Sequence, residues 1–382
     1  MQMDWEILEL ELTNFRKQLH KFPELSGKEK ETANRVIDFA RRFHQAKIIT
    51  KLGGEGVAVV FNGKESGKTI LIRCDLDALP IQEVNDFDYT SVYPNVSHKC
   101  GHDGHMAIVS GLIPLLADEK IKKGKVVLLF QPAEETGEGA NKVLQDPKFA
   151  GIVPDYVFAL HNLPGFPVNE IVVKENVFAF SSRGLIIKLK GNSSHAAEPE
   201  KGITPSLAVA ELIQDLTALP TMKAIKDFSL VTIIHARIGE RAFGTTPGYA
   251  ELMATLRSVN ENDMLNIKKQ AAKIIRSVAL KHRLTYEIEW VEEFPATIND
   301  SICVNMIRSG ADENHLSINE ISEPFRWSED FGHFTQKFKG AMFGIGAGIG
   351  HPELHHPDYD FPDEIIVTGT KMFYSIIKKA LN

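Results

Sequence analysis

Short apolar runs that lead into polar, chemically reactive side chains are the feature that most constrains the fold of this chain. The runs, each of a length suited to a strand, occupy residues 57–61, 69–74, 126–130, 156–160 and 341–345. Helical patterns occupy residues 4–21, 28–43, 104–116 and 363–381. Strands that alternate with helices are typical of a mostly parallel sheet with helices on both faces. The sequence therefore predicts an α/β fold.

Several of these runs carry reactive side chains to their ends or to the loops that follow. These side chains are Asp75, Glu134, Glu135, His161 and His355. The carboxyl ends of parallel strands meet at one edge of a sheet, and sites in such folds lie outside that edge. We therefore expect the five residues to converge there with Cys100 and His102, although the sequence separates the first from the last by nearly three hundred positions.

Residues 97–105, with the sequence SHKCGHDGH, combine a thiol, three imidazoles and a carboxylate. Cys, His and Asp bind borderline and transition metals, and the glycines let the backbone bend so that Cys100 and His102 can reach one ion. A solvated polar turn with one buried cysteine is the alternative interpretation of this motif taken alone.

A second domain interrupts the α/β pattern. Strand, helix, strand, strand, helix and strand patterns follow one another at residues 185–189, 205–219, 228–234, 251–256, 263–280 and 285–290. This β-α-β-β-α-β order is ferredoxin-like. We expect an inserted ferredoxin-like α+β domain over residues 181–292, with the catalytic domain formed by residues 1–180 and 293–382. A length of 382 residues also favours two domains.

The composition excludes several classes of partner. A formal net charge of −7 and an isoelectric point near 6.1 leave no basic surface for nucleic acid or anionic lipid. The first residues lack a basic and apolar leader pattern, and no apolar run approaches membrane-spanning length. Three cysteines, Cys74, Cys100 and Cys303, favour reduced thiols over disulfides. We therefore expect a cytoplasmic protein in which Cys100 is free to bind metal.

The candidate ligands are too numerous for one ion. Seven groups, Asp75 among them, exceed a tetrahedral set and fit a pair of ions, which can act on both the attacking and departing atoms of a hydrolysis. The adjacent Glu134 and Glu135 suit a division of labour, one as ligand and one as general base. A solvated loop is the alternative for this pair.

The chain resembles the N-acyl-amino-acid amidohydrolases, a branch of the aminoacylase and carboxypeptidase-type dinuclear metallopeptidases. That branch includes aminoacylase, hippurate hydrolase, N-acetyldiaminopimelate deacetylase and auxin-conjugate hydrolase types. The resemblance lies in residues 73–80 (RCDLDALP), 98–105 (HKCGHDGH), 131–135 (QPAEE) and 354–357 (LHHP), and extends from residues 16–25 to 363–364.

The resemblance implies a site for two divalent metal ions, with zinc, manganese, cobalt or nickel all suited to such ligands. Cys100 would be the bridging thiolate and Glu134 the general base. The other ligands implied are His102, Glu135, His161 and His355. The last could instead be its neighbour His356, which the pattern treats as variable. Asp75 and Asp77 resemble residues that keep the ligands correctly oriented. The resemblance also places Asp77 among the catalytic residues.

The inserted domain carries two further implied site residues. Residues 191–197 (GNSSHAA) resemble a block whose histidine, here His195, steadies the oxyanion, often across a dimer. An exposed loop imidazole is the alternative for His195. Residues 242–247 (AFGTTP) place Gly244 where the family usually has a substrate-binding Asn. We expect a homodimer or homotetramer assembled through this domain.

The predicted function is hydrolysis of the amide bond of N-acyl amino acids or related small amides, giving a carboxylic acid and an amine. Glu134 would act on a water activated between the two ions. One alternative is an amidase that uses Cys100 as nucleophile with His98, His102 or His105 as base. Another is a non-catalytic relative that binds a ligand.

Overall fold

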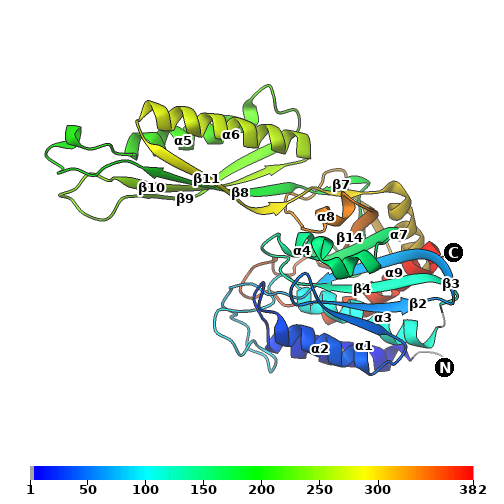
Figure 1. Cartoon of the computed structure of the whole chain (residues 1–382). Helices are drawn as coiled ribbons and strands as arrows, with labels where there is room; N and C mark the ends of the chain where they lie inside the picture. The colour runs from blue at the N-terminus through cyan, green and yellow to red at the C-terminus, as the bar shows by residue number, and fades with distance from the viewer. Residues whose placement is uncertain (1–3, 120, 382) are drawn as a thin grey trace. The chain divides into compact units, whose positions relative to one another are not determined.

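The apolar runs pair into two separate main sheets, each of which belongs to one of two units (Figure 1). The computed structural model describes residues 4–119 and 121–381. The larger unit comprises Met1–Phe178, Thr297–Pro324 and Asp330–Asn382, and the smaller unit comprises Ala179–Ala296 and Phe325–Glu329. The smaller unit is thus inserted within the sequence of the larger one.

Eight strands form the sheet of the larger unit, in the order β1-β2-β4-β3-β5-β14-β6-β13. They are β1 (Lys47–Leu52), β2 (Gly56–Asn62), β3 (Glu65–Asp75), β4 (Lys123–Gln131), β5 (Tyr156–Pro164), β6 (Ile171–Val173), β13 (Ile318–Glu320) and β14 (Lys339–Gly348). The central strands β4, β3, β5 and β14 are parallel, as are β6 and β13. The pairs β1–β2, β2–β4 and β14–β6 are antiparallel. The predicted α/β class with a mostly parallel sheet is confirmed.

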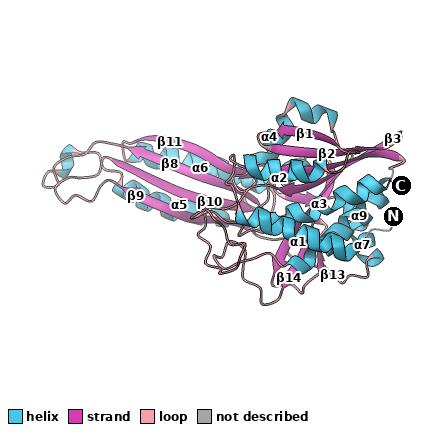
Figure 2. Cartoon of the chain, turned by 90° about the horizontal axis from the view of Figure 1, so that it is seen from below, coloured by secondary structure: helices cyan, strands magenta, loops and turns pink. Residues whose placement is uncertain are grey.

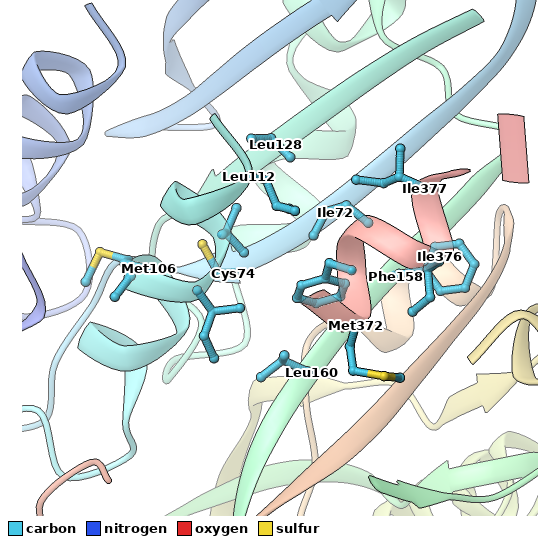
Figure 3. Packing of buried hydrophobic residues seen from close by; sticks show 14 of the residues in the cluster. Ile72, Cys74, Met106, Leu112, Leu128, Phe158, Leu160, Met372, Ile376 and Ile377 are labelled. Atoms are coloured by element: carbon cyan, nitrogen blue, oxygen red, sulfur yellow. The ribbon is translucent and has the colours of Figure 1, made fainter. Parts of the chain in front are cut away.

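Helices cover both faces of this sheet. On one face lie α1 (Trp5–Lys21), α2 (Lys30–Arg41), α3 (His102–Asp118), α7 (Ser301–Glu313) and α9 (Ile366–Leu381), which share one apolar core with alternate strand residues. Figure 3 shows Ile72, Leu128 and Phe158 of the strands packed with Leu112 of α3 and Ile376 of α9. The short helices α4 (Gly139–Gln145) and α8 (Gly332–Thr335) contact β4 and β14 on the opposite side (Figure 1). None of the described helices is long and apolar enough to cross a membrane.

The smaller unit contains a four-stranded antiparallel sheet in the order β11-β8-β10-β9. Its elements are β8 (Ser181–Lys190), α5 (Ser206–Ala218), β9 (Ser229–Ile238), β10 (Tyr249–Ser258), α6 (Glu261–Lys281) and β11 (Thr285–Phe294). Figure 2 shows both helices along the sheet. A separate core of alternate strand residues and one stripe of each helix holds them together. This is the predicted β-α-β-β-α-β order, and it gives a ferredoxin-like arrangement.

Short elements complete the chain. Two strands, β7 (Asn176–Ala179) and β12 (Thr297–Asn299), form a small sheet of their own. The 3₁₀ turns are η1 (Pro147–Gly151), η2 (Pro199–Lys201), η3 (Leu219–Thr221) and η4 (Asp363–Ile365).

Three element boundaries near the predicted site differ from the sequence expectation. Helix α3 begins at His102, two residues early, because Gly101 adopts a φ of +91° and turns the chain into the helix. Strand β5 continues to Pro164, so His161 lies inside a strand and not beyond it. The reason is its neighbour β14, which pairs with β5 past the point where β3 stops pairing. The last helix starts at Ile366, after the turn η4.

Candidate metal centre

The carboxyl edge of the parallel strands brings six of the predicted site residues of the larger unit together. Cys100 and His102 flank Gly101 at the start of α3, and His161 lies near the end of β5. Glu134 and Glu135 occupy the loop after β4, and His355 occupies the loop after β14. The predicted convergence is therefore observed for these six, and Asp75, the seventh residue of that prediction, lies within 4.8 Å of His102.

Two sets of possible metal ligands share the Cys100 thiol. Cys100, His102 and His161 form one set, here named the His161 corner, and Cys100, Glu135 and His355 form the other, the His355 corner. In each corner the ligand atoms lie within 4.8 Å of one another. A sulfur common to both sets can contact two ions at once, as a bridging thiolate does.

Two imidazoles are oriented by backbone carbonyl groups. His102 Nδ1 lies 2.9 Å from the backbone oxygen of Asp77, and His161 Nδ1 lies 2.9 Å from the backbone oxygen of Asn162. A carbonyl oxygen only accepts, so each Nδ1 carries a proton and Nε2 is the nitrogen that would bind a metal when the ring is neutral. The Nε2 atom of His161 lies 3.4 Å from the Cys100 sulfur. Both rings thus present the tautomer that binds a metal through Nε2.

Buried polar atoms at the centre of the cluster fit a cation. The Nε2 atom of His102 and the Oε1 atom of Glu135 have no hydrogen-bond partner. They lie 3.8 Å apart, and Glu134 Oε2 lies 3.9 Å from the same nitrogen. Buried polar atoms without a hydrogen-bond partner, as in His102 and Glu135, are costly. Divalent ions bound by thiolate, imidazole and carboxylate would remove that cost.

The two glutamates are aimed by a strained turn. Ala133, which precedes them, has a φ of +51°, a left-handed conformation that is uncommon outside glycine. Its N–H donates to Glu29 Oε1 at 2.8 Å. The N–H of Glu135 donates to Asp77 Oδ2 at 3.0 Å. Asp77 therefore orients a glutamate through its carboxylate as well as an imidazole through its carbonyl.

A network of buried groups that was not predicted from the sequence borders the cluster. Arg73 Nη1 contacts Asp75 Oδ1 at 2.6 Å, and Arg73 Nη2 contacts Asp330 Oδ1 at 2.6 Å. The N–H of Asp330 donates to Glu134 Oε1 at 3.4 Å. His105 Nδ1 lies 3.5 Å from Asp75 Oδ2. An arginine within an apolar strand was a usable signal for this network, whereas nothing in the pattern around Asp330 indicated its place.

The structure distinguishes the two adjacent histidines of the last motif. His355 Nε2 lies 3.9 Å from Glu135 Oε1 within the cluster. His356 points elsewhere, because its exposed ring contacts Asp358 Oδ1 at 2.5 Å. The assignment of the candidate ligand to His355 is therefore consistent with the geometry.

The electrostatics of the cluster reflect crowded acidic groups. Burial raises the pKa of the Cys100 thiol well above its ordinary value, and Glu135 raises it further. Burial also raises the pKa of Glu135 to about 7, although His102 opposes the shift. For His102, burial lowers the pKa, but Cys100 and Asp75 together raise it well above the usual range. Bound cations would favour thiolate, carboxylate and neutral imidazole instead.

The remaining two candidate residues lie in the smaller unit. His195 is exposed, and its Nδ1 accepts the N–H of Ala197 at 3.0 Å, which leaves Nε2 free to donate. The backbone oxygen of Gly244 accepts the N–H of Ala196 at 3.0 Å, and a Cβ on Gly244 would meet nothing within 4 Å. The two loops are thus paired with each other. The roles of His195 and Gly244 stay predictions.

A chain of buried charges adjoins the Cys100–His102 segment. Arg16 Nη1 lies 3.2 Å from Asp103 Oδ2, and His20 Nδ1 lies 2.8 Å from the same oxygen. His20 Nε2 lies 2.9 Å from Glu83 Oε1, which also accepts from Lys99 at 2.6 Å. Because Lys99 and Asp103 flank the candidate ligands in sequence, this chain of charges ties the ligand segment to helix α1.

Comparison with known proteins gives consistent matches over almost the whole chain. The model of peptidase family M20/M25/M40 matches residues 71–379. An N-acetylcysteine deacetylase of Bacillus subtilis is 30% identical over 95% of this chain and 94% of its own length. An N-acetyldiaminopimelate deacetylase of Priestia megaterium is 29% identical over 96% and 98%. The solved structure of the Bacillus subtilis YXEP protein, a dinuclear metal binding peptidase, has a TM-score of 0.83 at 28% identity and covers 98% and 99%.

The His20 imidazole is expected to make stability depend on pH. Burial lowers the pKa of His20, but Asp103 and Glu83 raise it overall from 6.5 to about 9. Because the pKa of His20 is higher in the folded state than in the unfolded state, the protonated ring stabilises the folded protein fully below pH 6.5. This stabilisation is lost as the pH rises through 9. We expect His20 to contribute a loss on the order of 3 kcal/mol in unfolding free energy across that range.

Denaturant unfolding at a series of pH values, compared with His20→Gln, measures this contribution. The wild-type protein should lose more stability than the variant as the pH rises. Parallel pH profiles for the two proteins would contradict the proposed protonation of His20.

Proposed function

This chain belongs to peptidase family M20/M25/M40, and on that premise we propose that it hydrolyses the amide bond of N-acyl amino acids or of related small amides. Water is consumed, and a carboxylic acid and a free amine are released. The observation that carries the proposal is the shared thiol of Cys100, which joins two ligand sets beside the adjacent carboxylates of Glu134 and Glu135. Full-length similarity to deacetylases of N-acetylated amino acids supports this substrate class.

In this proposal five residues would hold two divalent ions. Cys100 would be a ligand in both corners, with His102 and His161 in the His161 corner and Glu135 and His355 in the His355 corner. When bound, zinc, manganese, cobalt or nickel ions would polarise the amide carbonyl and acidify the attacking water. The protein itself fixes the ligands in place. In this proposal Asp75 and Asp77 orient the ligands without binding the ions.

Glu134 is the proposed general base. It takes a proton from the attacking water and gives that proton to the leaving nitrogen as the carbon–nitrogen bond breaks. Its position suits this role because Oε2 faces the ligand cluster, while Oε1 receives the N–H of Asp330 at 3.4 Å. A carboxylate with one oxygen held by a backbone N–H and the other facing the ligand cluster can shuttle a proton without moving far.

The smaller unit completes the proposal. His195, with Nε2 able to donate, would stabilise the negative charge that develops on the carbonyl oxygen. The loop that contains Gly244 would contact the substrate. We further propose a cytoplasmic protein that assembles as a dimer or tetramer through this unit.

Glu134→Gln is expected to keep its metal and to lose at least about 100-fold in turnover number, because the amide cannot accept the proton. The measurement is hydrolysis of a panel of N-acetyl amino acids, with metal content determined in parallel. Glu138→Gln is the matched control, since that exposed carboxylate contacts Lys142 and lies outside the cluster. Near-normal turnover in Glu134→Gln would reject the assignment of the base.

A cysteine-nucleophile mechanism is a second candidate, favoured by the 3.4 Å contact between Cys100 and His161. The two mechanisms respond differently to chelation. We expect exhaustive chelation to abolish activity and added metal to restore it, because the carbonyl is polarised only when ions are bound. Full activity after chelation, with loss on alkylation, would support the nucleophile instead. A metal-loaded protein that hydrolyses no member of the panel would favour a non-catalytic relative.

A further inference from the structure

Lys99 is a buried lysine whose ammonium group is fully hydrogen-bonded. Its side chain is 0% exposed. Nζ donates to Glu83 Oε1 at 2.6 Å, to Asn85 Oδ1 at 2.8 Å and to the backbone oxygen of Tyr359 at 2.7 Å. An ammonium has three donors, and all three are used here. The fold thus accommodates a buried charge at the point where two distant chain segments meet.

The backbone of the same residue holds the other end of the His355 loop. The carbonyl oxygen of Lys99 accepts the N–H of His355 at 2.7 Å. His355 has a φ of +65°, a left-handed conformation that costs free energy and persists only when its surroundings enforce it. Lys99 therefore binds both ends of residues 355–359, and the next residue in the chain is Cys100.

Further hydrogen bonds join this loop to the segment that contains Glu83 and Asn85, both of which the lysine contacts. The N–H of Val84 donates to the backbone oxygen of Pro357 at 3.2 Å, and Asn85 Nδ2 donates to that of Asp358 at 2.8 Å. Asn85 is itself held by the Lys99 ammonium. Without the ammonium, the segment around Asn85 and the His355 loop would both lose their common support.

We propose that Lys99 is a positioning residue that fixes His355 beside Cys100 and thereby sets the affinity of the ion in the His355 corner. The inference rests on the two-ion site of the proposed function. The His161 corner draws on β5 and on the start of α3, neither of which is part of the 355–359 loop. Loss of the ammonium should therefore weaken one ion selectively.

The test is a zinc titration of the folded protein in competition with a chromophoric chelator. In Lys99→Met we expect one ion to bind as in the wild-type protein and the other to bind about 10-fold to 100-fold more weakly. The weakened step should be the step that His355→Ala removes. Lys148→Met is the matched control and should keep both affinities. Its exposed ammonium also holds two backbone oxygens, those of Thr50 and Lys51, in another part of the larger unit.

A double variant guards against a folding defect. Lys99→Met/Glu83→Gln removes both charges of the Lys99–Glu83 pair, so the buried carboxylate is not left with His20 as its charged partner alone. It should show the same selective weakening. Unchanged affinities in either folded variant would overturn the inference, and so would equal weakening of both ions or a failure of both variants to fold, which would indicate a general structural role. A wild-type protein that binds fewer than two ions would contradict the two-ion site itself, and this inference with it.

Discussion

Parallel pairing of β4, β3, β5 and β14 is the constraint on which the rest of the structure depends. It places the ends of strands from distant parts of the sequence at one edge, where their loops deliver carboxylates and imidazoles to the start of α3. The same pairing crowds acidic groups in a buried space, which is unfavourable unless cations compensate. Arg73, Lys99 and Arg16 supply part of that charge from the protein side. Bound metal ions would supply the remainder.

Strand ends and motif spacing were enough to predict the α/β class, the inserted β-α-β-β-α-β unit and the clustering of Cys100 with the candidate imidazoles and glutamates. The reason is that β-branched runs and helical periodicity are local properties, and parallel strands leave few choices for where their ends meet. The lengths of the strands were harder to predict from the sequence. His161 lies inside β5 because β14 extends the pairing, which is a tertiary effect that residues 156–160 alone cannot reveal.

The positions of the groups that support the candidate ligands also could not be predicted from the sequence. Arg73 contacts Asp330, which lies 257 positions away in the sequence. Lys99 donates to a carbonyl oxygen 260 positions away. Such partners follow from how loops cross and not from local periodicity. The left-handed conformations of Ala133 and His355 also could not be predicted, since a positive φ is uncommon for every residue type other than glycine. In this chain, residue types are enough to predict the candidate ligands, whereas the groups that hold those ligands in position can be identified only from the fold.

Anomalous diffraction from crystals grown with zinc would test the central claim most directly. We expect two peaks that share contact with the Cys100 sulfur, one in the His161 corner and one in the His355 corner. A single peak would contradict the two-ion site. Peaks at the neighbouring group of Asp75, His102 and His105, without contact to Cys100, would contradict the assignment of the thiol as the shared ligand.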